Sequence, residues 1–243
     1  MRRLYVPPGE LRQGRIALRG DRARYLGAVL RSAVGDRFEI FDGSGARWPA
    51  AVASIAPDLV ELEVGAPLPA VQGAVDVVLA QALARGDKLD LVVQKATELG
   101  ASRIVPLHAQ RSVVKLDDRR GGARAERWRR IAQEAARQCG RADVPTIDNP
   151  MSWDELFANL QNEPERRAVL LQPEAALRLS AAARGASKLL IAVGPEGGFS
   201  PAEREAAERS GFIAAGLGPR VLCTETVALA ALAVVLHLHG ELG

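Results

Sequence analysis

Residues 191–205, IAVGPEGGFSPAERE, bring glycines and polar groups to a place where a ligand could bind. The apolar run 189–193 predicts a buried strand, which ends at the glycine-rich sequence GPEGG. A helix is then predicted, because Ser200 can serve as N-cap, Pro201 suits the first helical position and Glu203 completes a capping box. In open α/β proteins ligands bind where strands hand over to helices, and glycines there allow close approach to the backbone.

The glycine spacing of this loop does not match the common nucleotide-binding patterns. A dinucleotide fingerprint needs G-x-G-x-x-G after a first strand, and a P-loop needs Gly-Lys followed by Ser or Thr. A glycine-rich turn without any ligand therefore stays open as an alternative.

Two further segments could contribute polar groups to the same site. Residues 217–226, LGPRVLCTET, precede an Ala- and Leu-rich helix, and they place Thr224, Glu225 and Thr226 near its positive dipole end. An ordinary N-cap explains Thr224 equally well. Arg111 follows the predicted strand 103–107 at its carboxyl end, where sites of such sheets lie, although it could be a simple loop arginine.

The pattern of predicted elements changes near residue 70, from short strands to alternating strands and helices. This change predicts two domains, 1–70 and 74–243. In the first, alternation at 37–41, 48–55 and 59–64 predicts a meander of short strands, after a helical piece at 21–30. In the second, strands are predicted at 75–80, 103–107, 168–171 and 188–193, and a short segment at 213–217 is left without an assigned type. Helices are predicted at 87–99, 123–139, 201–210 and 226–239. This alternation favours an α/β fold with a parallel sheet covered on both faces.

The net charge is only +3, but the arginines cluster. Residues 1–50 hold ten arginines against five acids, and residues 119–141 hold eight against two glutamates. On the predicted helix 123–139 an apolar stripe (Trp128, Ile131, Ala132, Ala135 and Cys139) lies beside a ridge with Arg127, Arg130, Glu134, Arg137 and Arg141. Such a ridge could follow a phosphate backbone, or be a solvated face with local Glu–Arg pairs.

Composition argues against several other classes of protein. No apolar run is long enough to predict a membrane span. The two cysteines form no CxxC motif, which favours a reducing, cytoplasmic compartment, and the three histidines do not group into a metal site.

Several motifs together resemble one known family. The loops LQP (171–173), GPEGGFS (194–200) and LGPRVLCTET (217–226) follow one another in the order found in the RsmE family, the bacterial 16S rRNA (uracil-N3)-methyltransferases of the SPOUT superfamily. VVQKATELGASRIVPLHAQRS (92–112), RWRRIAQEAARQCGRADVP (127–145) and the opening RRLYV (2–6) are also similar to that family's segments. The resemblance covers nearly the whole chain.

This resemblance implies a complete functional hypothesis. It implies a small N-terminal PUA-like β-barrel that helps to hold RNA, and a C-terminal SPOUT domain with a deep trefoil knot. It implies S-adenosylmethionine bound by the knot loops, a homodimer, and methylation of uridine N3 in the decoding region of 16S rRNA, within the assembled small ribosomal subunit. The alternatives are a related SPOUT methyltransferase on another RNA, a non-catalytic RNA-binding assembly factor, and a nucleotide-binding α/β protein without an RNA role.

The hypothesis assigns roles to particular residues. Arg111 is expected to stabilise the developing negative charge, and Glu225 to act as a base or orienting group. Two positions depart from the family pattern: Tyr25 stands near a frequent histidine, and Cys223 replaces a frequent arginine, for which Arg220 or Arg111 could compensate. The expected cofactor-binding residues are Leu171, Gln172, Gly194, Pro195, Glu196, Gly197, Gly198, Leu217, Gly218, Leu222 and Thr226. The expected RNA-binding residues are Arg3, Arg31, Arg130, Arg137, Arg141 and Arg220.

Overall fold

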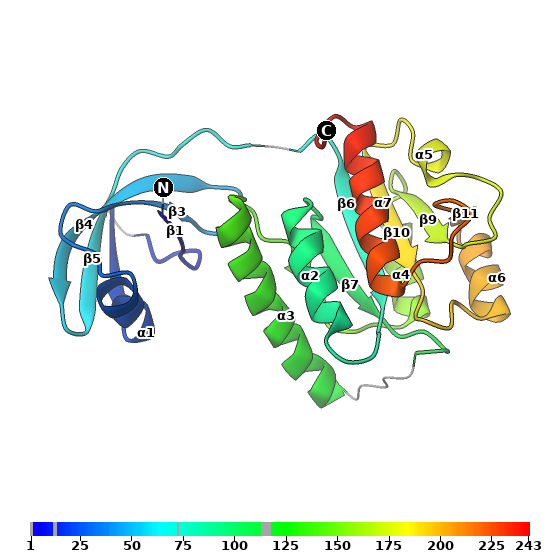
Figure 1. Cartoon of the computed structure of the whole chain (residues 1–243), viewed down its shortest axis with the longest axis horizontal. Coiled ribbons are helices and arrows are strands. Elements are labelled where there is room, and N and C mark those ends of the chain that lie inside the picture. Colours follow the sequence, from blue (N-terminus) through cyan, green and yellow to red (C-terminus); the bar gives the residue numbers. More distant parts are fainter. Residues whose placement is uncertain (1, 12–13, 72, 113–117) are drawn as a thin grey trace. The chain divides into compact units, whose positions relative to one another are not determined.

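The computed structural model describes residues 2–11, 14–71, 73–112 and 118–243, and the chain divides into two compact units (Figure 1). The N-terminal unit comprises Met1–Gln72 together with Ala136–Val144. The C-terminal unit comprises Gly73–Ala135 and Pro145–Gly243. Each unit is described below by itself.

The N-terminal unit is built on a mixed β-sheet with the order β1-β3-β4-β5-β2. The strand β1 (Arg2–Tyr5) runs parallel to β3 (Arg37–Phe41). The strands β3, β4 (Arg47–Ala56), β5 (Leu59–Val64) and β2 (Arg15–Arg19) are antiparallel neighbours. A short helix α1 (Asp21–Arg24) continues into one π-helical turn, η1 (Tyr25–Val29).

The alternation seen in the sequence explains this small sheet. In β2 the burial alternates residue by residue, so that Ile16 and Leu18 point into the core while Arg15, Ala17 and Arg19 face outward. The predicted meander at 37–41, 48–55 and 59–64 corresponds to β3, β4 and β5. The sequence analysis assigned no strand to 2–5 or 15–19, where β1 and β2 complete the sheet.

The C-terminal unit is a parallel α/β structure, as predicted. Its described strands form one sheet in the order β11-β9-β10-β6-β7-β8, and every pair in it is parallel. The strands are β6 (Asp76–Ala82), β7 (Arg103–Leu107), β8 (Thr146–Ile147), β9 (Arg167–Leu171), β10 (Lys188–Val193) and β11 (Ile213–Ala215). The helices are α2 (Lys88–Glu98), α3 (Asp118–Cys139), α4 (Trp153–Gln161), α5 (Leu179–Ala182), α6 (Pro201–Arg209) and α7 (Thr224–Leu238).

Helices cover both faces of this sheet, which requires apolar residues on both sides of the central strands. Strand β10 is buried from Leu189 to Val193. One face packs with Trp153 and Leu156 of α4 and with Ala207 of α6. On the other face α7 contacts β6 and β10 and lies beside α2 (Figure 1).

The parallel arrangement brings five connections to one edge of the sheet. The carboxyl ends of β6, β7, β9, β10 and β11 are Ala82, Leu107, Leu171, Val193 and Ala215. Because parallel strands point the same way, the loops that follow them gather at this edge.

The end of the described chain is fastened to the start of the domain. The Oε1 atom of Glu241 accepts a hydrogen bond from the main-chain N–H of Val75, at 2.9 Å. His239 interacts through Nε2 with the carbonyl oxygen of Ala186, at 2.9 Å. The segment that follows α7 is therefore held against segments at the start of β6 and just before β10.

The helix and strand predictions agree with most of this unit but omit three elements. Strands 103–107 and 188–193 coincide with β7 and β10. The omitted elements are α4, α5 and the two-residue β8. Helix α4 had a readable signal, because Ser152 caps it and Glu155 completes a capping box. The trefoil knot implied by the resemblance stays a prediction.

A charged network closes the opposite, amino-terminal edge of the sheet. Asp76 at the start of β6 receives hydrogen bonds from Ser102 and from the guanidinium of Arg166, the latter at 2.7 Å. Arg166 also donates to the carbonyl oxygen of Leu189, at 3.2 Å, so it connects β6 with β10. Burial acts to raise the pKa of Asp76, but these hydrogen bonds and the charges of Arg166 and Lys188 lower it overall.

We predict that Asp76→Asn lowers the free energy of unfolding at pH 7 by about 1–2 kcal/mol. Hydrogen bonds to charged groups contribute about 1.5–3 kcal/mol, and the 40% exposure of the Asp76 side chain reduces this. Because the folded-state pKa is depressed, this contribution is present above the unfolded pKa of about 3.9 and is lost as the pH falls through the folded pKa. Urea denaturation of both proteins between pH 7 and pH 3 should show the difference shrinking. A difference that is constant with pH would contradict this explanation.

Candidate functional site at the carboxyl edge of the sheet

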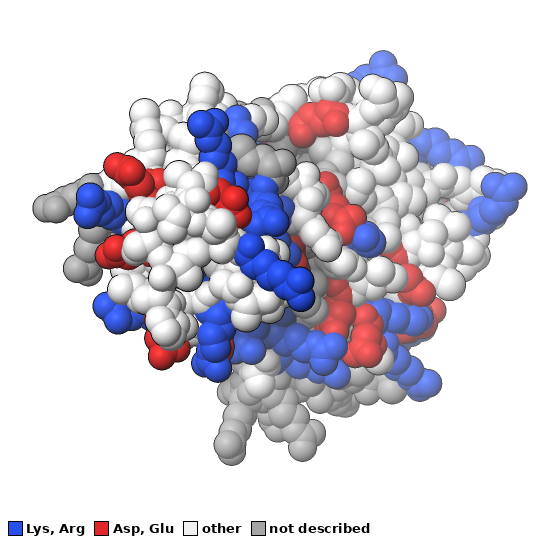
Figure 2. Space-filling model, turned by 60° about the vertical axis from the view of Figure 1, so that its left-hand side comes forward, with Lys and Arg blue, Asp and Glu red and all other residues white. Residues whose placement is uncertain are grey.

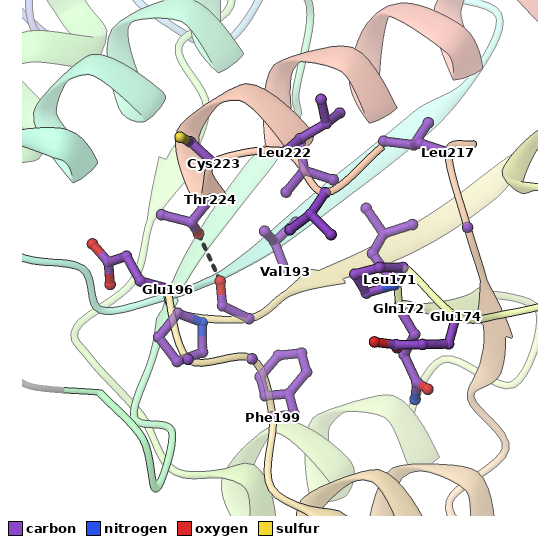
Figure 3. A pocket seen from close by; sticks show the side chains of 18 of the residues that line it. Leu171, Gln172, Glu174, Val193, Glu196, Phe199, Leu217, Leu222, Cys223 and Thr224 are labelled. Atoms are coloured by element: carbon purple, nitrogen blue, oxygen red, sulfur yellow. Dashed lines mark hydrogen bonds between the residues drawn. The ribbon is translucent and has the colours of Figure 1, made fainter. Parts of the chain in front are cut away.

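The loops at the carboxyl edge enclose a cavity of about 500 Å³, which we call the carboxyl-edge pocket (Figure 3). This volume lies in the range of sites for small molecules. Three loops form most of its wall, namely those after β9, β10 and β11. Its lining residues are Lys88, Arg111, Leu171, Gln172, Pro173, Glu174, Val193, Gly194, Pro195, Glu196, Gly197, Gly198, Phe199, Arg204, Ala215, Gly216, Leu217, Gly218, Arg220, Val221, Leu222, Cys223, Thr224 and Val227.

The loop after β10 makes a tight turn in which a glycine is needed at position 194. A Cβ atom at Gly194 would lie 3.3 Å from both the Cα of Gly198 and the main-chain nitrogen of Phe199. These are backbone atoms, so they cannot move aside as a side chain could. Gly198 has φ of 65°, which an L side chain rarely adopts. The glycines therefore fold the loop back on itself and leave its main chain at the pocket wall.

A second close approach joins the loops after β9 and β11. A Cβ atom at Gly216 would lie 3.1 Å from the carbonyl oxygen of Gln172 and 3.2 Å from that of Ala175. The main-chain N–H of Gln172 donates to the carbonyl oxygen of Ala215, at 2.9 Å. The two loops thus pack backbone against backbone. The side-chain Nε2 of Gln172 is buried and has no hydrogen-bond partner among the described residues, so the pocket wall holds a polar group without a protein partner.

Thr224, at the start of α7, connects the central strands to the last loop of the site. Its hydroxyl donates to the carbonyl oxygen of Gly194, at 2.6 Å (Figure 3). The hydroxyl oxygen of Thr224 in turn accepts a hydrogen bond from Nε2 of the fully buried Gln81, at 2.8 Å. One hydroxyl therefore links the ends of β6 and β10 to the first turn of α7.

A lysine at the start of α2 lies between two carboxylates at the pocket. The Nζ atom of Lys88 is 2.9 Å from Oε1 of Glu196 and 3.4 Å from Oε2 of Glu225. The hydrogen bond that Lys88 donates to Glu196 is the main cause of a raised pKa of Lys88. Burial acts to raise the pKa of Glu196, but Lys88 lowers it overall. Lys88 and Glu196 therefore keep their charges at neutral pH.

Arg111 reaches the pocket from the loop after β7. Its Nη1 atom donates to the carbonyl oxygen of Gly197, at 2.9 Å. A Cβ atom at Gly197 would lie 3.5 Å from the Cβ of Arg111, which is ordinary van der Waals contact. The guanidinium is thus held beside the glycine-rich loop while the residue as a whole stays exposed to solvent.

Most of the residues expected to bind a cofactor line this pocket. They are Leu171, Gln172, Gly194, Pro195, Glu196, Gly197, Gly198, Leu217, Gly218 and Leu222. Arg111 and Arg220 line it as well, whereas Glu225 and Thr226 do not. Thr226 is exposed, and the carboxylate of Glu225 lies against Lys88.

The expected cofactor-binding residues did not include several polar residues of the lining, namely Lys88, Glu174, Arg204, Cys223 and Thr224, although Thr224 and Cys223 had been singled out in the same segment. Lys88 and Arg204 lie in the first turns of α2 and α6, whose amino ends face the same edge. That position could have been inferred from the strand–loop–helix order. The double hydrogen bond of Thr224 joins distant segments, so local sequence carries no sign of it.

Among the expected RNA-binding residues, Arg3 is engaged within its own unit. Its side chain is only 11% exposed and pairs with Glu39 at 2.7 Å. It also donates to the carbonyl oxygens of Ala136 and Arg141, at 3.1 and 2.9 Å, and lies over the ring of Phe41. This geometry favours a structural role for Arg3, because its donors already face carboxylate and carbonyl oxygens.

The other expected RNA-binding arginines are partly available at the surface. Arg130 and Arg31 are exposed, while Arg137 lies over the ring of Tyr25 and Arg141 pairs with Asp143. Figure 2 shows basic side chains mixed with acidic ones on the face that it draws. Some members of the arginine ridge are therefore paired and others are exposed, and contact of the ridge with a phosphate backbone stays a prediction.

Among the described residues there is no candidate metal site and no candidate membrane-spanning helix. No group of three or more His, Cys, Asp or Glu side chains is arranged to hold a metal ion there. In the same residues, no helix has the length and apolar character needed to cross a membrane. Both cysteines of the described chain, Cys139 and Cys223, are free and exposed, so Cys139 does not belong to the buried stripe predicted for helix 123–139.

Comparison with known protein families gives two matches, one in each half of the chain. Residues 72–236 match the model of an RNA methyltransferase domain. Residues 18–65 match the model of an RNA methyltransferase PUA domain. Residues 66–71 separate the two matched segments.

Individual relatives agree with the family models. The chain is 40% identical to ribosomal RNA small subunit methyltransferase E of Bacillus subtilis over 169 residues, which is 66% of this chain and 65% of that protein. It is 31% identical to the Synechocystis protein of the same name over 96% of this chain and 76% of the relative. The solved structure of the Neisseria gonorrhoeae enzyme of that name, bound to S-adenosyl methionine, is 30% identical, with a TM-score of 0.88 over 98% of both chains.

We predict that Thr224→Val lowers the free energy of unfolding by about 2–4 kcal/mol. The substitution keeps the shape of the side chain but leaves the carbonyl of Gly194 and the buried amide of Gln81 without their partner, and each buried unsatisfied group costs about 1–3 kcal/mol. Thr226→Val is the matched control, since Thr226 is exposed on the same helix and should change stability by less than about 0.5 kcal/mol. Chemical denaturation measures both. Equal effects of the two substitutions would show that the hydroxyl of Thr224 is not an important link.

Proposed function

Because the chain belongs to the family of RNA methyltransferases with a PUA domain, we propose that it transfers a methyl group from S-adenosylmethionine to ribosomal RNA of the small subunit. The observation that supports this most directly is the carboxyl-edge pocket, whose wall consists of the loops that resemble the family's motifs. The resemblance to the RsmE family is itself confirmed by the curated relatives.

The pocket fits the proposed cofactor in size and in chemistry. A cavity of about 500 Å³ can hold a nucleoside joined to an amino acid. The close packing at Gly194 and Gly216 places main-chain groups at the wall, where they can hydrogen-bond to a polar ligand. The buried Nε2 of Gln172 offers one further donor. We therefore assign cofactor binding to the loops 171–174, 194–199 and 216–224.

S-adenosylmethionine supplies a methyl group that is electrophilic because it is attached to a cationic sulfur. The residues of the chain then have to orient the acceptor and stabilise the negative charge that develops on it. Holding two reactants in line can contribute roughly 7–11 kcal/mol. Arg111 is the proposed stabilising charge, because its guanidinium is fixed beside the glycine-rich loop by its bond to Gly197.

The geometry around Glu225 favours a supporting role over that of a general base. Its carboxylate is 22% exposed and lies 3.4 Å from Nζ of Lys88, and the residue is not part of the pocket wall. We propose that it orients Lys88, which in turn holds Glu196 at the wall. The proton of the acceptor would then pass to solvent water, and the anion that remains would be stabilised by nearby positive charge, with Arg220 and Arg204 as further contributors at the pocket.

The acceptor that we propose is N3 of a uridine in the decoding region of 16S rRNA, within the assembled small subunit. Proteins that modify or read RNA bases favour exposed, unstacked bases and the shape of a folded RNA. The exposed arginines Arg130 and Arg31 are candidates for contacts to phosphates. The proposal also includes a homodimer, a cytoplasmic location and the trefoil knot. In support of the knot, the chain leaves the edge strand β11 and returns as α7 to the central strands β6 and β10.

The decisive experiment is a transfer assay with labelled S-adenosylmethionine. Small subunits from cells that lack their own uridine-N3 methyltransferase are the substrate, with naked 16S rRNA, 23S rRNA and tRNA as comparison. Mass spectrometry should locate the label at N3 of one uridine of the small subunit. Label on another RNA would replace the proposed substrate. Cofactor binding without transfer to any RNA would favour a non-catalytic assembly factor, and would make Cys223→Arg the next variant.

We predict that Arg111→Ala lowers kcat by roughly 100-fold, the size of effect seen when one stabilising donor is removed from an active site. The affinity for S-adenosylmethionine should change by less than about threefold, because Arg111 contacts the loop by a single hydrogen bond to Gly197. Single-turnover kinetics and calorimetric titration measure the two effects.

Arg209→Ala provides the control for Arg111→Ala, since Arg209 is exposed on α6 and should leave both quantities unchanged. Equal losses of kcat and cofactor affinity in Arg111→Ala would instead indicate that Arg111 only supports the loop.

A further inference from the structure

The carboxylate of Glu203 joins three segments that surround the carboxyl-edge pocket. Its Oε2 atom accepts a hydrogen bond from the main-chain N–H of Ser200, at 2.7 Å, as the capping box predicts. Its Oε1 atom accepts two more, from the main-chain N–H of Gln110 at 2.7 Å and from Nε1 of Trp153 at 3.1 Å. One side chain therefore binds the loop after β7, the start of α4 and the start of α6.

These bonds also restrict the position of Arg111. Gln110 directly precedes Arg111, whose guanidinium donates to the carbonyl oxygen of Gly197. Gly197 and Ser200 belong to the same short loop after β10, and Ser200 is bonded back to Glu203. Arg111 is thus fixed at both its ends, by Glu203 through the main chain and by Gly197 through the guanidinium.

Through its hydrogen bond with Trp153, Glu203 also acts on one wall of the pocket. The ring of Trp153 lies edge-on to that of Phe199, with centroids 5.0 Å apart. Phe199 is almost completely buried and lines the pocket (Figure 3). The Oε1 atom of Glu203 accepts hydrogen bonds from both Gln110 and Trp153. One oxygen therefore sets both the position of Arg111 and the packing around Phe199.

A second capping box in the same unit shows that these bonds exceed what capping requires. Glu155 caps α4 in the same way, and its carboxylate accepts from the N–H and the hydroxyl of Ser152, at 2.7 and 2.9 Å. The hydrogen bonds described for Glu155 remain within its own capping box. Glu203 makes the same capping bond and adds two long-range bonds that reach the pocket.

We propose that Glu203 is a positioning residue for the methyl-transfer reaction. It serves this reaction by holding Arg111 and the loop 194–200 in fixed positions relative to each other. The expected effect of Glu203 on kcat rests on the proposed function, whereas its expected effect on the position of the Arg111 loop does not. Misplacement of a reacting group by about 1 Å can lower a rate by about 100-fold, so a residue outside the pocket can control turnover.

Glu203→Gln separates positioning from capping. A glutamine oxygen can still accept from the N–H of Ser200, so the capping box is retained. The amide nitrogen then faces the N–H groups of Gln110 and Trp153, which are donors as well, so both long-range bonds are lost. We expect kcat to fall by roughly 10- to 100-fold, while the affinity for S-adenosylmethionine changes by less than about threefold. Hydrogen exchange of the amide of Gln110 should accelerate.

Glu155→Gln is the matched control, because it makes the same chemical change in a capping box without long-range bonds. Its melting temperature should fall less than that of Glu203→Gln, which also loses the two long-range bonds, and its kcat should equal that of the unchanged protein. The double variant Glu203→Gln with Arg111→Ala should have the kcat of Arg111→Ala alone, since Glu203 has no further effect on kcat once the side chain of Arg111 is removed. Additive losses, or equal kcat values for Glu203→Gln and Glu155→Gln, would overturn the proposal.

Hydrogen exchange keeps this test separate from the test of the function. If the unchanged protein transfers no methyl group to any RNA, the proposed function fails, but Gln110 exchange still reports on Glu203. Faster exchange in Glu203→Gln alone would support its positioning of the Arg111 loop. Unchanged exchange would overturn that positioning whatever the reaction is.

Discussion

The carboxyl-edge pocket depends on one buried hydroxyl, that of Thr224. A parallel sheet brings the loops to one edge, but it does not fix how they meet. Thr224 does this for the central strands, because its oxygen accepts from Gln81 at the end of β6 and donates to Gly194 at the end of β10. Gln81 is fully buried, so the bond that it donates to Thr224 cannot be exchanged for a solvent contact without cost. The first turn of α7, and with it the last wall of the pocket, is placed by this link.

The walls of the pocket divide into a shape-determining part and a charged part. Main chain packs against main chain at Gly194 and at Gly216, where even a methyl group would meet backbone atoms. Such walls recognise a ligand by shape and by amide groups. The charged side chains stand around them, with Lys88 held between Glu196 and Glu225, and with Arg111 held by Gly197. The guanidinium of Arg111 thus brings positive charge to the pocket in a fixed position, which suits a reaction in which negative charge develops at one atom.

Local sequence signals sufficed for much of the fold and for part of the site. The apolar run of β10 and the capping box at Ser200 predicted a strand–loop–helix unit, and the glycine-rich loop between them lies at the pocket. Helix α4 was not predicted, although it begins with an equally clear capping box. The sequence therefore contained the signal, and the interpretation overlooked it. Strand β8 has two residues and is formed by pairing with β7, for which a sequence gives no sign. The same holds for Arg3 and Glu203. Their types predicted an RNA contact and a helix cap, while their additional partners lie 36 to 138 and 50 to 93 positions away.

The order of the pocket loops along the chain has a consequence for how the protein is made. Synthesis proceeds from the amino end, so the loops after β7, β9 and β10 leave the ribosome before the loop after β11 and the helix α7. Until residues 216–227 have emerged, the pocket has no third wall, and Thr224 has not yet reached Gln81 and Gly194. A nascent chain that has not yet reached α7 therefore has no complete ligand site, so the pocket can take up a ligand only after this helix has been synthesised.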